Sequence, residues 1–141
     1  MKRFPLIISL LLIVSFLAAC GGNSNALLET NWEWTALIET MPAAQSVVPD
    51  PENYTLVFNQ DGTFNAKVDC NQVSGSYEID GDKLSLMPGP STMAECGPES
   101  LYDLFLAYLI LIDSYAIDDE MLILKLGDGA GEMQFQNAGS Q

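Results

Sequence analysis

Hydrophobic and polar residues alternate along most of the chain after residue 27, and this pattern predicts a series of short strands. A first strand ends near Glu39, and residues 40–53 are predicted to form a loop because they hold three prolines and show little periodicity. Three hairpins and a short closing strand follow, at residues 54–68, 77–86, 115–124 and 133–135. Their large residues are expected to face one core, because alternate positions of a strand share a face.

One helix is predicted between the second and third hairpins. Pro98 and Glu99 suit its first turn, because proline lacks the N–H that has no partner there and glutamate faces the positive end of the helix dipole. Apolar residues then recur at helical spacing as far as Ile112. A helix of about 15 residues that is apolar on most sides should be deeply buried, so we expect a curved sheet around it. A segment that dips into a membrane is the alternative, although Asp103 and Asp113 bracket the stretch.

The first 19 residues differ from the rest of the chain and resemble an export signal. The chain begins with Met1, Lys2 and Arg3, two of which are basic, and residues 4–19 carry no charge. This apolar run is shorter than the ~20 residues that span a bilayer as a helix, and it fits a secretory signal. Leu17-Ala18-Ala19-Cys20 resembles a bacterial lipobox, in which the cysteine is lipidated and begins the mature chain. We expect a lipoprotein signal peptide at 1–19 and a lipidated Cys20 with a flexible tether at 20–26. The alternatives are an uncleaved anchor with an incidental cysteine and secretion without a lipid.

Removal of this signal changes the charge of the protein. The whole chain has 19 acidic and five basic residues, no histidine and a formal charge of −14. Loss of Lys2 and Arg3 leaves three lysines and a formal charge of −16. Such a chain repels phosphate, so we expect no nucleic-acid partner, and the lipid must hold the protein at the membrane. The scattered acids most simply give solubility, and a face for a cationic partner is the alternative, with the densest acids at 113–132.

Cys70 and Cys96 remain once Cys20 is assigned to the lipid. An exported protein meets an oxidising compartment, where an even number of remaining cysteines predicts one disulfide. A loop of about 27 residues would stabilise the fold by roughly 3.5 kcal/mol in the chain-entropy model. A metal site with two thiolates is the alternative, although the sequence has no histidine and no Cys-x-x-Cys motif to complete it.

The composition also restricts catalysis. Without histidine, the usual activation of a serine or cysteine nucleophile is excluded, and so is any histidine-ligated metal. Two carboxylates could act together as in glycoside hydrolysis. With 19 acidic residues many such pairs arise by chance, so their presence is not a specific sign of catalysis. The segments 80–82 and 127–129 resemble parts of calcium loops without the spacing of an EF-hand, which leaves weak surface calcium binding as an alternative. We expect no catalytic residues, no metal and no cofactor.

Three segments of the sequence resemble the META domain, which is the domain of HslJ-type heat-shock lipoproteins. They are DCNQVSGSY at 69–77, GDKL at 81–84 and TMAEC at 92–96, followed by a leucine-rich helix. The matching motif positions are Asn71, Ser74, Gly75, Tyr77 and Thr92. The resemblance covers about 27–136 and leaves a tail at 137–141 that we expect to be loose. Thr30 and Asp69 stand where many members of the family have glycine.

The resemblance implies an α+β, mainly β, fold: an antiparallel barrel-like curved sheet of about seven or eight strands packed around one α-helix. It implies a place in the cell envelope and in stress response, and it brings no established catalytic residues. We therefore expect an exported lipoprotein, anchored to the bacterial cell membrane or outer membrane, with a non-catalytic module that meets an envelope protein. The alternative is a carrier or sensor of a small apolar ligand between sheet and helix. It is motivated by large apolar side chains that include Trp32, Trp34, Phe58, Phe64, Phe105 and Tyr108.

Overall fold

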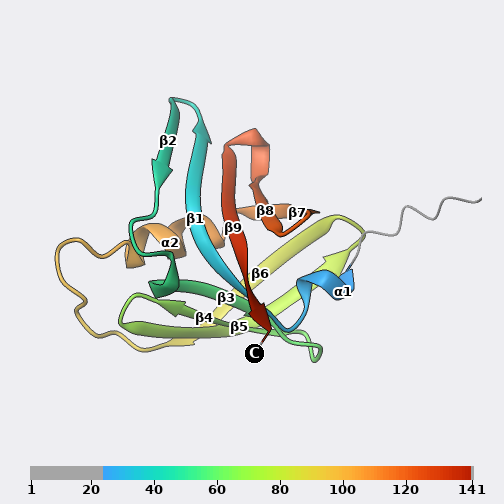
Figure 1. Cartoon of the computed structure of the whole chain (residues 1–141), viewed down its shortest axis with the longest axis horizontal. Helices are drawn as coiled ribbons and strands as arrows, with labels where there is room; N and C mark the ends of the chain where they lie inside the picture. Colours follow the sequence, from blue (N-terminus) through green and yellow to red (C-terminus); the bar gives the residue numbers. More distant parts are fainter. Residues whose placement is uncertain (1–23, 141) are drawn as a thin grey trace, which may run out of the picture.

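The computed structural model describes residues 24–140 of the chain. Its strands are β1 (Thr30–Thr40), β2 (Ala43–Val47), β3 (Tyr54–Phe58), β4 (Thr63–Val68), β5 (Asn71–Asp80), β6 (Lys83–Ser91), β7 (Ile112–Asp118), β8 (Met121–Leu126) and β9 (Gly131–Ser140). The helices are α1 (Ser24–Leu27) and α2 (Tyr102–Leu109), with short 3-10 turns η1 (Pro51–Asn53) and η2 (Gly127–Gly129). Figure 1 shows the strands curving around α2.

Neighbouring strands all pair antiparallel, in the order β2-β1-β3-β4-β5-β6-β7-β8-β9, and β1 also pairs with β9. Eight strands therefore close into a barrel, and β2 remains outside the ring on the edge of β1. This arrangement confirms the predicted fold class. Closure leaves few unpaired edges where the ladders are long, and the ring is joined most weakly between β6 and β7, which pair only at Lys83 and Ser114.

The three predicted hairpins are confirmed as β3–β4, β5–β6 and β7–β8. The first two turn at Gly62 and Gly81, whose φ angles of +83° and +66° are open to glycine at little cost. Asp119 takes a similar conformation in the third, with φ of +52°, which aspartate tolerates better than most residues. Alternation and turn chemistry therefore located these strand pairs.

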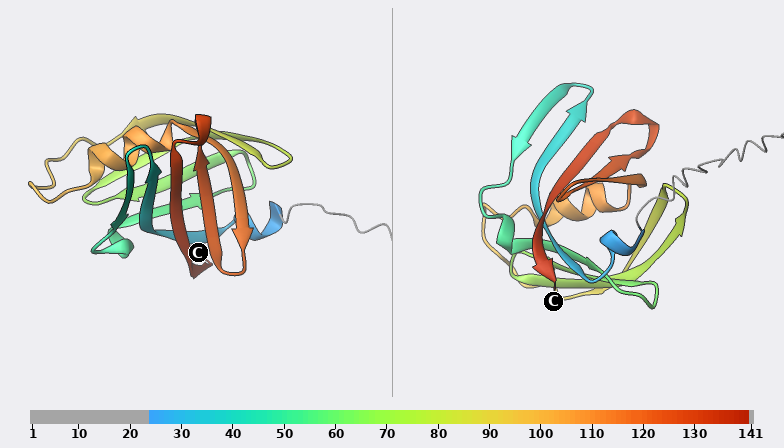
Figure 2. Two further views of the ribbon diagram at one scale, coloured as in Figure 1. Left: turned by 90° about the horizontal axis from the view of Figure 1, so that it is seen from above. Right: turned by 45° about the vertical axis from the view of Figure 1, so that its right-hand side comes forward.

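Large apolar side chains from the strands and from α2 fill the barrel. Phe105 and Leu109 of α2 are fully buried one helical turn apart, so they share the face that meets the sheet. The ring of Phe105 packs edge-on against those of Trp34 and Phe135, with centroids 5.4 and 6.3 Å away. Burial of each large apolar side chain stabilises the fold by roughly 1.5–3 kcal/mol, and these aromatic contacts add to that stabilisation. Figure 2 shows α2 lying in the mouth of the barrel.

The predicted helix is shorter than the expected segment 98–112. The N–H of Leu101 donates to the hydroxyl of Tyr54 at 2.9 Å, and this contact with β3 fixes the start of α2. At the other end, Ile112 already pairs with Leu126 in the β7–β8 ladder. Tertiary pairing therefore overrides helical spacing at both ends of the segment.

The expectation of a deeply buried helix is also wrong, because α2 buries one face. Leu104 in the helix is 37% exposed, and Ile110 and Leu111 immediately after it are 61% and 51% exposed. Its eight residues lie against the barrel through the side of Phe105 and Leu109. Within residues 24–140, no helix is long and apolar enough to cross a membrane.

Three segments expected to be irregular contain regular structure. Residues 40–53 hold β2 and η1 rather than a loop alone. The loose tail is wrong for 137–140, because β9 continues to Ser140 and Asn137 pairs with Trp32. Ser24 and Asn25, expected in the tether, lie in α1. These elements escaped prediction because β2 is exposed on both faces and α1 is a single turn, so neither carries a hydrophobic period. The predicted signal peptide and Cys20 lie outside the described residues.

Candidate functional site

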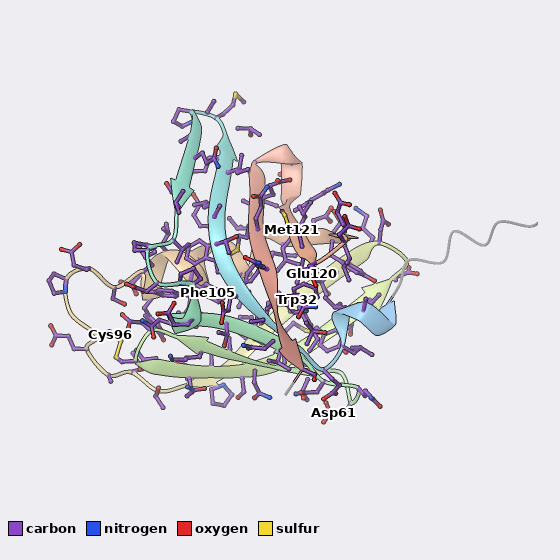
Figure 3. All side chains as sticks on the ribbon, in the orientation of Figure 1. Trp32, Asp61, Cys96, Phe105, Glu120 and Met121 are labelled. Carbon is purple, nitrogen blue, oxygen red and sulfur yellow. A yellow bond between two sulfur atoms is a disulfide. The ribbon has the colours of Figure 1, made fainter. Side chains whose placement is uncertain are left out.

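A cluster of motif residues holds the loop 92–101 against the beginning of β5. We call this cluster the Asn71 clasp, and its members are Cys70, Asn71, Thr92, Ala94 and Cys96. Cys70 lies in the turn before β5, Asn71 begins that strand, and the other three follow β6. Figure 3 shows Cys96 at the end of the molecule where this loop extends from the barrel.

Asn71 is the one buried polar residue within 24–140, at 1% exposure, and its amide is fully used by the loop. Its Oδ1 accepts hydrogen bonds from the N–H of Ala94 at 2.7 Å and the hydroxyl of Thr92 at 2.9 Å. Its Nδ2 donates to the carbonyl of Ala94 at 2.9 Å and to Sγ of Cys96 at 3.2 Å. These contacts satisfy a buried amide that would cost about 1–3 kcal/mol if it were left without partners.

Thr92 and the two cysteines complete the clasp. The N–H of Gln72 donates to the Thr92 hydroxyl at 2.9 Å, and the N–H of Thr92 donates to the carbonyl of Gln72 at 3.0 Å. Cys70 and Cys96 form a disulfide with their Cα atoms 5.5 Å apart. The disulfide prediction is therefore confirmed, and the alternative metal site with two thiolates is wrong because both sulfurs are used in the bond.

Gly75 lets β6 and β4 pack closely on β5, and the hydroxyl of the neighbouring Ser74 donates to the carbonyl of Pro90 at 3.5 Å. A Cβ on Gly75 would lie 2.3 Å from the carbonyl oxygen of Met87 and 2.6 Å from the ring of Phe64, distances that no side chain can occupy. The pairing of β5 with β6 is also irregular between Val73 and Gly75. Glycine is needed here for space rather than for its backbone freedom.

Tyr77 lies at the opposite end of β5 from the clasp. Its hydroxyl donates to the carbonyl of Asn59 at 2.6 Å, and its ring packs edge-on against Phe58 with centroids 5.1 Å apart. Burial, followed by the negative charges of Asp61 and Glu29, raises the pKa of the Tyr77 hydroxyl. This tyrosine ties the β3–β4 turn to β5, and it does not contact the clasp.

The motif residues therefore separate into two structural groups. Asn71, Thr92 and the two cysteines are brought together, whereas Ser74, Gly75 and Tyr77 act along β5. Sequence reasoning missed the backbone of Ala94, whose N–H donates to the Asn71 amide and whose carbonyl accepts from it, two of the four bonds of that amide. No side-chain signal could have found it, because any residue has the same main-chain groups.

The charged side chains of the described residues lie mostly in solvent. Lys83 forms an exposed ion pair with Asp113 at 2.8 Å, and this hydrogen-bonded contact raises the pKa of the lysine. Hydrogen bonds from Thr63 lower the pKa of Asp61 in the β3–β4 turn. These are local surface contacts, and each couples a carboxylate to a single neighbouring residue.

The cavities described in residues 24–140 are depressions open to solvent. One of about 350 Å³ lies beside Lys83 and Asp113, and another of about 400 Å³ lies over Gln72 and Ser74. No group of three or more His, Cys, Asp or Glu in this part of the chain could hold a metal ion. Aromatic rings such as Phe105 occupy the space between sheet and helix, where a carrier would hold an apolar ligand.

The fold and the Asn71 clasp together define a class of small antiparallel barrel with one helix in its mouth and a disulfide-linked loop at one end. The META domain model matches residues 25–139, and the chain belongs to this family. A search of curated proteins gave no match.

Two solved structures share the fold. A protein from Burkholderia xenovorans, determined by NMR, is 23% identical with a TM-score of 0.66, and the match covers 82% of this chain and 86% of that one. A crystal structure of a DUF4847 family protein from Bacteroides vulgatus is 15% identical with a TM-score of 0.63, covering 85% and 99%. At these identities the similarity concerns the fold alone.

Proposed function

We propose that this protein is an exported lipoprotein whose META domain is a non-catalytic interaction module. In this proposal the lipid on Cys20 holds the barrel at the bacterial membrane, and the far end of the barrel meets another envelope protein. Support of the envelope under stress, which membership of the family suggests, would be the physiological role. The observation that carries the proposal is the placement of α1 and the Asn71 clasp at opposite ends of the domain.

The attachment end of the domain is well defined. Leu27 of α1 is fully buried, and its carbonyl accepts a hydrogen bond from the indole of Trp32 at 3.0 Å. From Cys20 to Ser24 the chain can reach at most about 14 Å, because an extended residue spans ~3.3–3.6 Å. A lipid on Cys20 would therefore hold the barrel close to the bilayer surface.

The presenting end lies away from this attachment. In Figures 1 and 2 the loop 92–101 extends from the end of the barrel opposite α1, and β2 rises on the same side as that loop. Large apolar side chains are exposed there, with Met41 at 91% and Met93 at 88%. In this proposal the two methionines are the points at which the partner protein makes contact.

The chemistry of the clasp supports a binding role rather than catalysis. Each polar atom of the Asn71 amide is bonded within the domain, so the clasp sets the shape of the loop and offers no reactive group to a substrate. The disulfide adds a covalent restraint on the same loop. A rigid loop loses little entropy on binding, which favours recognition of a partner.

The anchor is tested by Cys20→Ser in the full chain, followed by separation of membrane and soluble fractions. We expect the protein to leave the membrane or to keep its signal peptide, together with loss of incorporated labelled fatty acid. Unchanged membrane lipidation would reject the lipid assignment.

The partner is tested by photo-crosslinking in living cells. A crosslinking phenylalanine analogue at Met41 or Met93 should give a discrete adduct with another envelope protein. The matched control is Gln60, which is exposed and whose N–H bonds to Glu29 beside α1, at the attachment end. Adducts at Gln60 alone, or at none of the three positions, would contradict the proposed orientation and role.

A further inference from the structure

The strand β2 presents an unprotected sheet edge to solvent. Within residues 24–140 it pairs with β1 over five residues, from Ala43 to Val47, and with no second strand. All five residues are exposed, and Val47 is 74% exposed. The N–H and C=O groups on the outer side of such a strand are free to pair with another chain.

The chemistry of this edge contrasts with the rest of the protein. Residues 40–49 contain no Asp, Glu, Lys or Arg, in a chain that has 19 acids. Natural edge strands are commonly protected by charged side chains, by internal proline or by bulges. β2 has none of these within its length, although it is short and Pro42 precedes it.

Acidic residues lie at both ends of the uncharged strand. Glu39 lies opposite Ala44 on β1, one strand inside the edge, where its carboxylate accepts a hydrogen bond from the hydroxyl of Tyr108, and Asp50 and Glu52 follow β2 in the chain. An added strand would therefore have a neutral centre, with Asp50 and Glu52 near one end and Glu39 one strand further away near the other. We propose that β2 binds an extended segment of a partner protein by strand addition, and that this segment carries lysine or arginine beside a neutral, β-forming centre.

Charge decides between such a partner and a second copy of this chain. Antiparallel pairing of two β2 strands about Gln45 would bring no Lys or Arg to the flanking carboxylates, because residues 40–49 contain neither. Residues 24–140 contain all 19 acids and three lysines, so two copies would also repel each other over their whole surfaces. A basic segment would instead be attracted to the same carboxylates.

This inference rests on the proposed role as an interaction module and specifies the chemistry of its partner. It is tested with the full chain, labelled with ¹⁵N, in micelles of a neutral detergent. The probe is the peptide Lys-Thr-Val-Thr-Val-Thr-Lys, and the controls are the same peptide with Glu at both ends and one N-methylated at alternate residues. Strand addition depends mainly on the main chain, so a generic sequence is an adequate probe. We expect saturable shifts centred on 43–47 with the basic peptide, and little or no response with either control.

Charge substitutions provide matched variants that do not disturb the core. With the peptide centred on Gln45, Ser46→Lys should weaken binding of the basic peptide about threefold at low ionic strength and Ser46→Glu should strengthen it similarly. This is the effect expected for a charge roughly 8 Å from one terminal lysine and roughly 14 Å from the other in water. Gln60→Lys and Gln60→Glu make the same changes of net charge at the other end of the barrel, and each should alter binding less than twofold. Both positions are exposed in the native protein.

Several results would overturn the inference. These are absence of binding, equal binding of basic and acidic peptides, or equal effects at positions 46 and 60, which would indicate general charge attraction. Shifts of 43–47 that grow with protein concentration without peptide would assign the edge to a second copy. If the basic peptide does not bind while crosslinks at Met93 capture a partner protein, the β2 inference is wrong and the proposed function stands. If the peptide binds but no crosslink forms in cells, the proposed function fails instead.

Discussion

The Asn71 clasp can be tested by removal of a single amide. In Asn71→Ala the loop loses two bonds to the backbone of Ala94 and one to the hydroxyl of Thr92, at 2.7–2.9 Å. Each such bond contributes a net ~1 kcal/mol, and the weaker contact with sulfur is neglected, so we expect a loss of about 3 kcal/mol in unfolding free energy. Because Ala94 is itself exposed, water can replace part of the lost bonding, and the cost should not rise far beyond this value.

The assay is urea unfolding followed by circular dichroism, with the disulfide intact in every variant. At this chain length 3 kcal/mol corresponds to a fall of about 10 °C in Tm. The control is Gln72→Ala, because Gln72 is exposed and contributes only its main chain to the clasp, which the variant retains. A change below about 0.5 kcal/mol in Asn71→Ala, equal to that of the control, would refute the assigned role.

The isosteric change Asn71→Asp adds a pH dependence of known sign. The carboxylate keeps both acceptor contacts, but it faces the carbonyl of Ala94 where the amide donated a hydrogen bond. Burial and this repulsion should raise the folded-state pKa of the new carboxyl above its unfolded value of ~3.9. The native variant then binds its proton more tightly, so its stability deficit should be small at low pH and should grow as pH rises through the raised pKa. A deficit that does not depend on pH would contradict the hydrogen-bond assignment.

Three further predictions follow from other contacts. The double variant Cys70→Ser, Cys96→Ser should lose about 3.5 kcal/mol in urea unfolding if the loop-closure entropy dominates, and an unchanged midpoint would exclude that contribution. Gly75→Ala should cost about 3 kcal/mol because its methyl group has no space, whereas Gly81→Ala, with open surroundings, should cost about 1 kcal/mol for its positive φ, and similar losses in the two would contradict the packing account. A hydrogen bond to a carboxylate raises the pKa of Tyr108, so the stability that its hydroxyl contributes is complete below pH ~10 and is lost as pH rises through the raised value. The difference between wild type and Tyr108→Phe should therefore shrink above pH ~10, and a constant difference up to pH ~11.5 would reject the contact.

Several strands of the barrel could be predicted because their residues alternate between a buried and an exposed face. In β4, Phe64, Ala66 and Val68 are buried while the residues between them reach solvent, and the sequence shows the same alternation. The motif around Cys70 and Asn71 was also visible in the sequence, because its residue types carry specific chemistry. Two of the four partners of the Asn71 amide were not visible, since they are the N–H and carbonyl of Ala94, 23 residues further along the chain.

The helix shows where a local pattern is insufficient. Its apolar residues run past Leu109 to Ile112, and helical periodicity extends across both. The structure ends α2 at Leu109 because Ile112 is required opposite Leu126 in the barrel. A pairing partner 14 residues away cannot be read from the spacing of one segment.

The sequence by itself therefore determined the alternating strands, their acidic turns, the paired cysteines and the acidic composition, all of which depend on near neighbours or on residue type. Only the tertiary structure decided that the sheet closes through β1 and β9, that β2 is left outside as a free edge, and that the Asn71 clasp lies opposite α1. The physical reason is that closure, edge exposure and the separation of two ends are relations between distant parts of the chain. They arise when burial of one shared core selects a single arrangement of locally similar strands.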